Sequence, residues 1–366
     1  MTTPDVEPLT GYTVAVTADR RREDLAELLH RWGARVVLAP ALRVVPLADD
    51  TELRLATRAS VARPLDMIIV TTGVGLRGWL EAAEGWGLAE PLRYRLGAGY
   101  LVTRGPRVGA AVRAAGLADS WSPGSESDDE VLDHVLDIGV AGKRIALQLH
   151  GEPQPEFSAA LRDAGADVIE VPVYRWAPPL DPAPLRRLVD LIAGRLVDAV
   201  TFGSAPAVGS LLRAAGPDAG PVLHALRTGV IAACVGPMTA APLRRHGVPV
   251  IEPSRARLGA LVRALVEELP RRARTLRIAG TAVTLRGHAA IVDGTLRPLA
   301  PAPMSVLRAL ADNPGRVLSR ACLLRSLPRG ADEHAVEMAV ARLRVALGGT
   351  GYVQTVAKRG YRLRVD

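Results

Sequence analysis

Four short turns in the first 240 residues combine glycine with hydroxyl-bearing or basic side chains, a pattern suited to binding an anion. They are Thr71-Thr72-Gly73, Thr103-Arg104-Gly105, Gly203-Ser204-Ala205 and Gly236-Pro237-Met238-Thr239. Each turn precedes an amphipathic segment, so backbone N–H groups and the positive end of a helix dipole would face the anion. Arg107, beside the second turn, and His150, after another apolar run, are candidates for the same site. The same residue types are also ordinary helix N-caps, so the prediction depends on the four turns sharing one face.

Other kinds of chemistry lack the residues that they need. The sequence shows no nucleophile with a base and an orienting acid, and no Gly-rich dinucleotide or phosphate loop. The histidines lack metal-ligand spacing, and the two cysteines, Cys234 and Cys322, make neither a disulfide framework nor a metal cluster. No apolar run approaches the ~20 residues of a membrane span, and the first residues lack the pattern of a signal peptide. We therefore expect a cytoplasmic protein with no cofactor, no metal and no membrane contact.

Positive charge is concentrated at the C-terminal end of the chain. Residues 271–366 contain 17 Lys or Arg and 6 Asp or Glu, whereas the other 270 residues contain 29 and 32. A GC-rich genome explains a preference for arginine over lysine, but it does not explain the scarcity of acids. The imbalance is typical of a nucleic-acid-binding domain attached to a near-neutral body.

The elements that position the four turns come from an internal duplication. Landmarks recur 131 or 132 residues apart: Gly11 and Gly142, Gly33 and Gly165, Pro40 and Pro172, Asp66 and Asp198, Gly105-Pro106 and Gly236-Pro237. In each copy, apolar runs such as DMIIVTTG and DAVTFGSA alternate with helical segments such as 22–32 and 156–164. This alternation predicts an α/β fold with two doubly wound parallel-sheet lobes that face each other across a cleft. Ligands of such sheets bind at the carboxyl ends of the strands, where the turns lie.

The motifs VAVTADR, DMIIVTT, VPVYRW and GPMTAAPLRRHG resemble those of uroporphyrinogen-III synthase, over residues 10–268. The resemblance implies one lobe made of residues 1–40 and 175–268 and a second made of 41–174, joined by a two-strand linker near 39–45 and 171–176. It also implies a polycarboxylate, a linear tetrapyrrole, as the substrate in the cleft. A linker tyrosine is implicated in catalysis in that family, and the matching residue is Tyr174, for which packing at a hinge is the alternative.

Three turns depart from the family's pattern. The first has Thr72 in place of serine, and the second has Thr103-Arg104-Gly105-Pro106-Arg107 in place of Val-Gly-x-x-Thr-Ala. The third has Leu149-His150-Gly151 where the family has an arginine or cysteine before glycine. Arg104 and Arg107 would strengthen carboxylate binding. These differences favour a body that binds an anion without turning it over.

The C-terminal hundred residues predict a winged helix-turn-helix domain. Short strands over 276–298 include a hairpin at Asp293-Gly294. Helices are expected at 303–311, 320–327 and 333–347. The third is capped by Asp332 and has one buried stripe, formed by Val336, Val340, Leu343 and Leu347. Residues 352–363 form a last hairpin, which would be the wing.

The pieces NPGRVLSR, ARLR, QTV and GYRL resemble an OmpR/PhoB-type effector domain, over residues 274–366. In that family the third helix enters the major groove of DNA and the wing contacts the adjacent minor groove. Arg342 matches the family's base-contacting arginine, which would bind guanine through two hydrogen bonds, and Thr355 matches a wing threonine that contacts the backbone. Further candidates for phosphate contacts are Arg344, Arg320, Lys358 and Arg359, with a solvated basic face as the alternative.

Proteins with this pair of domains resemble regulators of nitrate and nitrite assimilation. We therefore expect a transcription regulator that binds double-stranded DNA and whose body senses an anionic small molecule or a tetrapyrrole. Two alternatives stay open. One is a bifunctional protein that still cyclises hydroxymethylbilane, and the other is a body that serves only to form a homodimer or to hold a partner regulator.

Overall fold

A computed structural model describes residues 7–19, 21–124, 127–253, 257–327 and 332–366. Contacts divide the chain into two compact units: Met1–Ala41 with Pro179–Asp366 (unit 1), and Leu42–Pro178 (unit 2). Unit 1 contains an α/β lobe, here called lobe 1, followed by the C-terminal domain, residues 274–366. Among the described residues, no helix combines the length and apolarity needed to cross a membrane.

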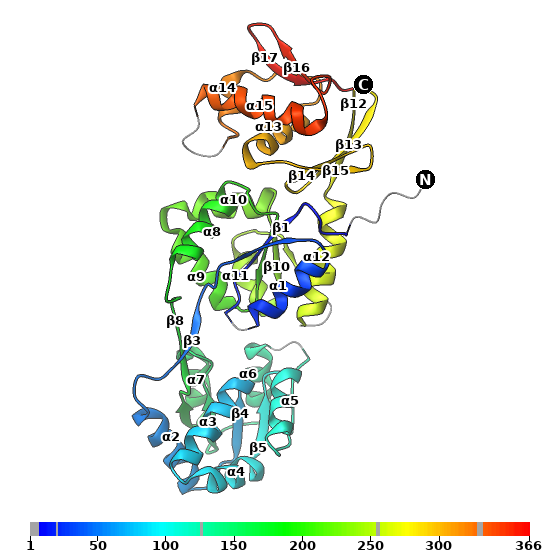
Figure 1. The fold of residues 1–366 in the computed structure, drawn as a ribbon. Helices are drawn as coiled ribbons and strands as arrows, with labels where there is room; N and C mark the ends of the chain where they lie inside the picture. The colour runs from blue at the N-terminus through cyan, green and yellow to red at the C-terminus, as the bar shows by residue number, and fades with distance from the viewer. Residues whose placement is uncertain (1–6, 20, 125–126, 254–256, 328–331) are drawn as a thin grey trace. The chain divides into compact units, whose positions relative to one another are not determined.

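Lobe 1 is a sheet of five parallel strands in the order β11-β10-β9-β1-β2. These strands are β1 (Thr13–Val16), β2 (Arg35–Leu38), β9 (Ala199–Phe202), β10 (Ile231–Cys234) and β11 (Val250–Ile251). One face is covered by α1 (Arg22–Arg31) and α12 (Leu258–Arg271) (Figure 1). The other carries α8 (Ala183–Ala193), α9 (Ala205–Ala215), the 3-10 turn Gly216–Asp218, α10 (Ala219–Thr228) and α11 (Pro237–Arg245). Because helices cover both faces, the central strands are continuous apolar runs.

Unit 2 has four parallel strands in the order β5-β4-β6-β7. They are β4 (Met67–Val70), β5 (Tyr100–Thr103), β6 (Arg144–Gln148) and β7 (Asp167–Val171). One face packs on α2 (Thr51–Ala62), α3 (Gly73–Gly85), α4 (Ala89–Ala98) and α5 (Pro106–Ala114), and the other on α6 (Asp128–Asp137) and α7 (Pro155–Asp163). A further antiparallel pair, β3 (Arg43–Pro46) with β8 (Tyr174–Ala177), is the expected two-strand linker, a few residues later than predicted.

The fold confirms the doubly wound α/β prediction and the register of the duplication. Segment β1-α1-β2 corresponds to β6-α7-β7, and the pairs β4-α3 and β5-α5 correspond to β9-α9 and β10-α11. Each lobe therefore combines the first half of one copy with the second half of the other. The expected C-terminal glycines Gly33 and Gly165 both adopt a φ of about +90° (+85° and +90°), a left-handed conformation that disfavours other residues.

The C-terminal domain is a winged helix preceded by an antiparallel sheet. The sheet contains β12 (Arg274–Ile278), β13 (Thr281–Arg286), β14 (Ala289–Val292) and β15 (Thr295–Pro298), and positive φ at Asp293 and Gly294 forms the predicted hairpin turn. Then come α13 (Pro301–Asp312), α14 (Arg320–Leu324), α15 (Glu333–Leu347), β16 (Val353–Val356) and β17 (Gly360–Leu363). The predicted caps Ser319 and Asp332 both accept backbone N–H groups, and the predicted stripe of α15 is buried. Helix α14 ends three residues earlier than expected, because the next turn closes with i→i+3 hydrogen bonds.

Candidate functional site

The carboxyl ends of β4 and β6 in unit 2 are joined by a buried hydrogen-bond network. The Thr71 hydroxyl donates to the carbonyl oxygen of Gln148 (2.7 Å), and the Thr72 N–H donates to Gln148 Oε1 (3.0 Å). The Thr72 hydroxyl also accepts the N–H of Gly75 (3.1 Å), so Thr72 is the N-cap of α3, whose first residue is Gly73. A side chain at position 75 would overlap the Gln148 amide. The first predicted turn is thus fixed to the neighbouring strand by a glutamine.

The linker tyrosine reaches this turn. The Tyr174 hydroxyl lies 3.2 Å from Thr72 Oγ1, and the tyrosine side chain is buried. Tyr174 also lines a cavity of about 630 Å³ whose walls include Glu52, Glu152 and Glu170. These three carboxylates outnumber the one arginine of the lining, Arg175, so the cavity disfavours a polycarboxylate and the turn is the better place for an anion.

A second cluster at the same edge joins the turn after β5 to the turn after β6. Arg104 Nη1 lies 3.6 Å from Asp128 Oδ2, and His150 Nε2 lies 3.9 Å from the same oxygen. Burial lowers the pKa of His150 to about 4. The nearby carboxylate of Asp128 favours the protonated ring and acts in the opposite direction, but its effect on the pKa is smaller. His150 is therefore a neutral ring at pH 7, while Arg104 carries the charge.

Two buried polar atoms of this cluster have no hydrogen-bond partner among the described residues: Thr103 Oγ1 and Arg104 Nε. Arg107 lies exposed on the first turn of α5. Unpaired buried polar atoms are costly, so a change that gives either atom a hydrogen-bond partner would stabilise this edge. Unit 2 thus brings together the predicted residues of its first two turns, His150 and Tyr174.

Lobe 1 holds the other predicted turns at the carboxyl ends of its own strands. Ser204 precedes α9 without making a side-chain cap, and Ala205 is the first residue of that helix. Thr239 is buried in the first turn of α11. These residues share one edge of lobe 1, as the equivalent residues do in unit 2. Anion binding at either edge stays a prediction.

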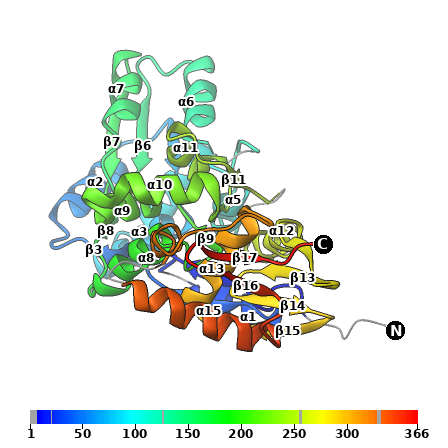
Figure 2. The same cartoon turned by 90° about the horizontal axis from the view of Figure 1, so that it is seen from above.

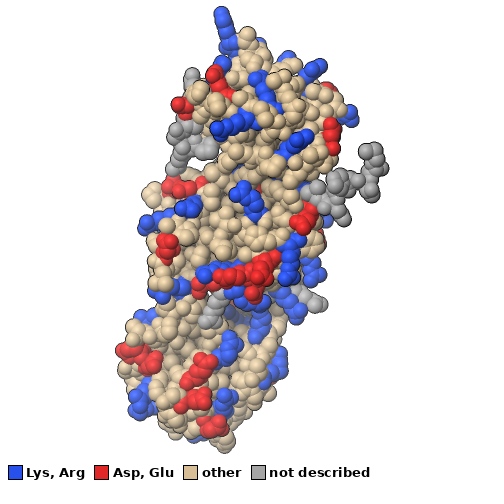
Figure 3. Space-filling view, in the orientation of Figure 1, with Lys and Arg blue, Asp and Glu red and all other residues tan. Residues whose placement is uncertain are grey.

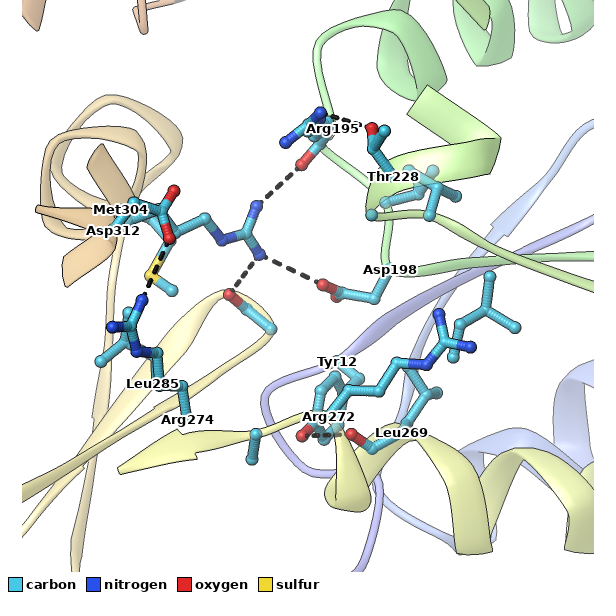
Figure 4. A pocket seen from close by; sticks show the side chains of 17 residues that line it. Tyr12, Arg195, Asp198, Thr228, Leu269, Arg272, Arg274, Leu285, Met304 and Asp312 are labelled. Carbon is cyan, nitrogen blue, oxygen red and sulfur yellow. Dashed lines mark hydrogen bonds and ion pairs between the residues drawn. The ribbon is translucent and has the colours of Figure 1, made fainter. Parts of the chain in front are cut away.

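The amino edge of the lobe 1 sheet carries the C-terminal domain. Asp198, just before β9, accepts the N–H of Thr13 through Oδ2 (2.8 Å) and a guanidinium N–H of Arg308 from α13 through Oδ1 (3.2 Å). The same arginine donates to the carbonyl oxygens of Arg195 (3.0 Å) and Gly287 (2.8 Å). Figure 4 shows the adjoining pocket of about 330 Å³, with Asp198 and Arg195 facing it from lobe 1 and Met304 and Asp312 from the C-terminal domain. We call this contact the seam.

The seam is close-packed at its centre. The backbone of the β13–β14 turn meets the backbone before β1, where the His288 N–H donates to the Gly11 carbonyl (2.6 Å), and a side chain at position 287 would overlap that carbonyl. His288 Nε2 lies 3.9 Å from Asp198 Oδ2. Burial raises the pKa of Asp198 and lowers that of His288. The carboxylate and its cationic partner are therefore held in a site with little water.

The exposed face of α15 is the candidate nucleic-acid interface. Its solvent-facing residues are His334, Glu337, Met338, Ala341, Arg342 and Val345. Figure 2 shows α15 along the outer side of the C-terminal domain, and Figure 3 shows Lys and Arg side chains spread over the visible face of that domain. Lys358 and Arg359 are exposed at the wing turn, where Lys358 adopts a positive φ of 60°. The predicted base-contacting arginine is thus accessible.

Two predicted phosphate contacts have partners inside the domain. Arg344 donates to the Val353 carbonyl (2.8 and 3.0 Å) and to Thr355 Oγ1 (2.8 Å), which ties α15 to the wing. Arg320 binds Glu337 (3.1 Å). Arg344 in this position therefore orients Thr355 and the wing.

Sequence reasoning missed Gln148, Asp128, Arg308 and His288. One of them had a usable signal. Gln148 is the duplication partner of Thr17, and both side chains are buried and hydrogen-bonded across to the neighbouring strand. Gln148 Oε1 accepts the Thr72 N–H (3.0 Å), and the Thr17 hydroxyl donates to the Thr201 carbonyl (2.7 Å). A polar residue at the end of an apolar run in both copies marks the strand ends where anion binding is predicted. The other three are brought into place only by tertiary contacts.

These features define a class: an α/β body of two duplicated lobes followed by a winged-helix DNA-binding domain. The family described as uroporphyrinogen-III synthase HemD matches residues 23–263, and that described as transcriptional regulatory protein, C terminal, matches residues 294–363. The chain is 28% identical over 257 residues to an uncharacterised protein, YjjA, of Bacillus subtilis (strain 168), covering 69% of this chain and 94% of that one. A solved uroporphyrinogen III synthase of Thermus thermophilus is 31% identical, with 70% of this chain and 100% of that chain covered and a TM-score of 0.60.

The chain belongs to the uroporphyrinogen-III synthase family. It joins that body to an OmpR/PhoB-type DNA-binding domain, which is the combination of a transcription regulator.

Proposed function

We propose that this protein regulates transcription and that its body binds an anionic ligand of the tetrapyrrole class and transmits the bound state to the DNA-binding domain. The observation that carries the proposal is the seam. It joins the DNA-binding domain directly to lobe 1, through Arg308 and Asp198, while the exposed face of α15 stays uncovered.

In lobe 1, the turns predicted to bind an anion and the seam lie at opposite ends of the same strands. β1 and β9 each span four residues, about 13 Å of extended chain. Asp198 precedes β9 and Thr13 begins β1, whereas Thr17 and Ser204 follow the carboxyl ends of these strands. A ligand that shifts α9 relative to β1 would therefore act on the Thr13–Asp198–Arg308 contacts.

A ligand titration tests the sensing part of the proposal. Uroporphyrinogen III is added to the full chain while thermal unfolding and affinity for a selected operator are followed. We expect stabilisation and a changed DNA affinity, both weakened by Arg104→Ala. The matched control is Arg113→Ala, an exposed arginine on the same strand-helix unit that pairs with Asp119. Equal responses of the two variants would contradict the role of Arg104.

Two substitutions test the DNA-binding part. Arg342→Ala should lower affinity for the operator by about 1–3 kcal/mol and relax the preference at one base pair. Lys358→Ala should weaken binding to all sequences and reduce its salt dependence. If Arg342→Ala keeps the wild-type ratio of specific to scrambled binding, the assignment is wrong.

The second candidate function is a bifunctional synthase. The Thr72–Tyr174 contact supports it, because a linker hydroxyl lies beside a turn that is predicted to bind an anion. Hydroxymethylbilane is incubated with the protein, and the uroporphyrinogen isomers are separated. Type III product above the spontaneous level, lost in Tyr174→Phe, would establish the enzyme and contradict a purely sensory body.

The pathway is part of the same proposal. We propose control of nitrate and nitrite assimilation genes, from the resemblance stated above, and a homodimer or a partner regulator as the DNA-bound state. Genome-wide mapping of binding sites tests the pathway, and the mass of the DNA complex tests its composition.

A further inference from the structure

The exposed face of α15 carries an apolar stripe. Met338 is 43% exposed and Val345 81%, and the small side chain of Ala341 lies exposed between them. At about 100° per residue the three side chains fall within roughly 60° of each other on the helix. They are not part of the core, because the buried stripe of α15 occupies the opposite side. Exposed apolar groups that align on one face mark a contact surface.

The surroundings of the stripe indicate what covers it. Arg342 flanks it on one side, and Lys358 and Arg359 are exposed on the wing. The acid on the other flank, Glu337, is paired with Arg320 at 3.1 Å, and that arginine also lies 5.5 Å from the ring centre of Tyr361. The stripe therefore has a cation on one flank and, on the other, an acid that is paired with an arginine. This charge pattern suits DNA, whose major groove presents thymine methyl groups between two rows of phosphates.

We propose that Met338, Ala341 and Val345 contact thymine methyl groups in the major groove, beside the guanine bound by Arg342. The inference rests on the proposed DNA-binding function and adds a second source of sequence preference to it. Met338 and Val345 are seven residues apart, about 10 Å along the helix, which matches the rise of about three base pairs. The operator should therefore hold at least two thymines within three or four base pairs, next to a guanine.

The test uses the full chain and removes one methyl group at a time. An operator is first selected from random duplex DNA, and each thymine is then replaced singly by deoxyuridine, which lacks only the C5 methyl. Affinity is measured by fluorescence anisotropy at fixed salt. Losing the burial of one methyl group weakens binding about fourfold, so we expect this loss at two or three adjacent positions. In Val345→Ala the loss should vanish at one of them, and in Met338→Ala at a neighbouring one.

Two control variants separate the methyl contact from general effects. Val345→Thr keeps one methyl group and should retain sensitivity to deoxyuridine. Lys358→Ala should bind more weakly at every position but with unchanged sensitivity. Because Val345 is mostly exposed, these substitutions leave the core intact.

Different results of these measurements would contradict different parts of the proposal. Uniform affinity across all deoxyuridine substitutions, or unchanged sensitivity in both Val345→Ala and Met338→Ala, overturns the inference while leaving DNA binding in place. Failure to enrich any sequence overturns the proposed function as well. A stripe that becomes protected from solvent when the chain self-associates without DNA would assign the surface to a protein partner and also overturn the inference.

Discussion

Removing Arg308 tests whether the seam couples lobe 1 to the DNA-binding domain. Its guanidinium contacts Asp198, the Arg195 carbonyl and the Gly287 carbonyl, so Arg308→Ala leaves a carboxylate that is 9% exposed without its cationic partner. Breaking a buried pair from one side costs about 3–5 kcal/mol. Arg308 is about one-third exposed (32%), so water replaces part of its interaction. We therefore expect Arg308→Ala to destabilise the closed seam by about 2–3 kcal/mol, at or just below the low end of this range.

Hydrogen exchange measures the opening of the seam directly. The His288 N–H donates to the Gly11 carbonyl across the seam, so it exchanges only when the two domains separate locally. A loss of about 2–3 kcal/mol corresponds to a roughly 30- to 150-fold faster exchange, at about 1.4 kcal/mol per factor of ten. The control is Arg274→Ala, whose partner Asp312 is 71% exposed and on the same domain. An exposed pair contributes about 0–1 kcal/mol, so that variant should change the exchange of His288 by less than about sixfold.

A functional readout accompanies the exchange measurement. Because the face of α15 is uncovered, Arg308→Ala should retain its basal affinity for the operator and lose most of its response to ligand. Adding Asp198→Asn to Arg308→Ala should recover part of the exchange protection, because the double variant buries no unpaired carboxylate. Unchanged exchange of His288 in Arg308→Ala, or equal exchange in Arg274→Ala, would refute the reasoning.

Three further predictions concern the rest of the molecule. The pKa of His150 is about 4 in the folded state, so between about pH 6.5 and 4 only the unfolded state gains a proton. The free energy of unfolding should therefore fall by about 2 kcal/mol from about pH 7 to 5. Denaturant unfolding should show this loss in the wild type and not in His150→Gln. Arg344→Lys should loosen the wing and weaken binding to all DNA sequences, with faster exchange of wing amides, because lysine cannot serve two acceptors on β16 in the same way. Gly75→Ala should lower the stability of unit 2 by about 1–3 kcal/mol in thermal unfolding through its overlap with Gln148, whereas Gly85→Ala on the same helix, with open space around it, should not.

Much of the fold could be predicted because its determinants are local. Buried parallel strands leave continuous apolar runs, and Gly33 and Gly165 mark helix ends by a conformation that other residues avoid. The register of the duplication was visible because the landmark residues do the same structural work in both copies. The end of α14 was harder to predict, since Leu324 and Leu327 are equally apolar and only the hydrogen bonds of the turn distinguish them.

The candidate site was predictable only in part, because spacing shows which residues can lie near each other but not where a side chain points. Thr72 and Tyr174 were both singled out, yet their contact depends on β8 lying beside the start of α3. Arg344 has the type and position of a phosphate contact, but at the half-buried edge of α15 its guanidinium is within reach of two acceptors on the wing. The seam residues give no local pattern, because Arg308 and Asp198 are 110 residues apart.

The duplication itself shows how the DNA-binding domain is attached. Asp66 and Asp198 are equivalent residues, and each accepts the first N–H of the neighbouring strand at 2.8 Å, from Arg144 and from Thr13. Asp66 is exposed, whereas Asp198 is buried and bound to Arg308. In both lobes the carboxylate therefore helps to pair two strands, and docking in lobe 1 gives Asp198 a second hydrogen-bond partner, Arg308. Because the two oxygens of Asp198 hold β1 to β9 and lobe 1 to α13, we expect a change in the pairing of these strands to alter the seam.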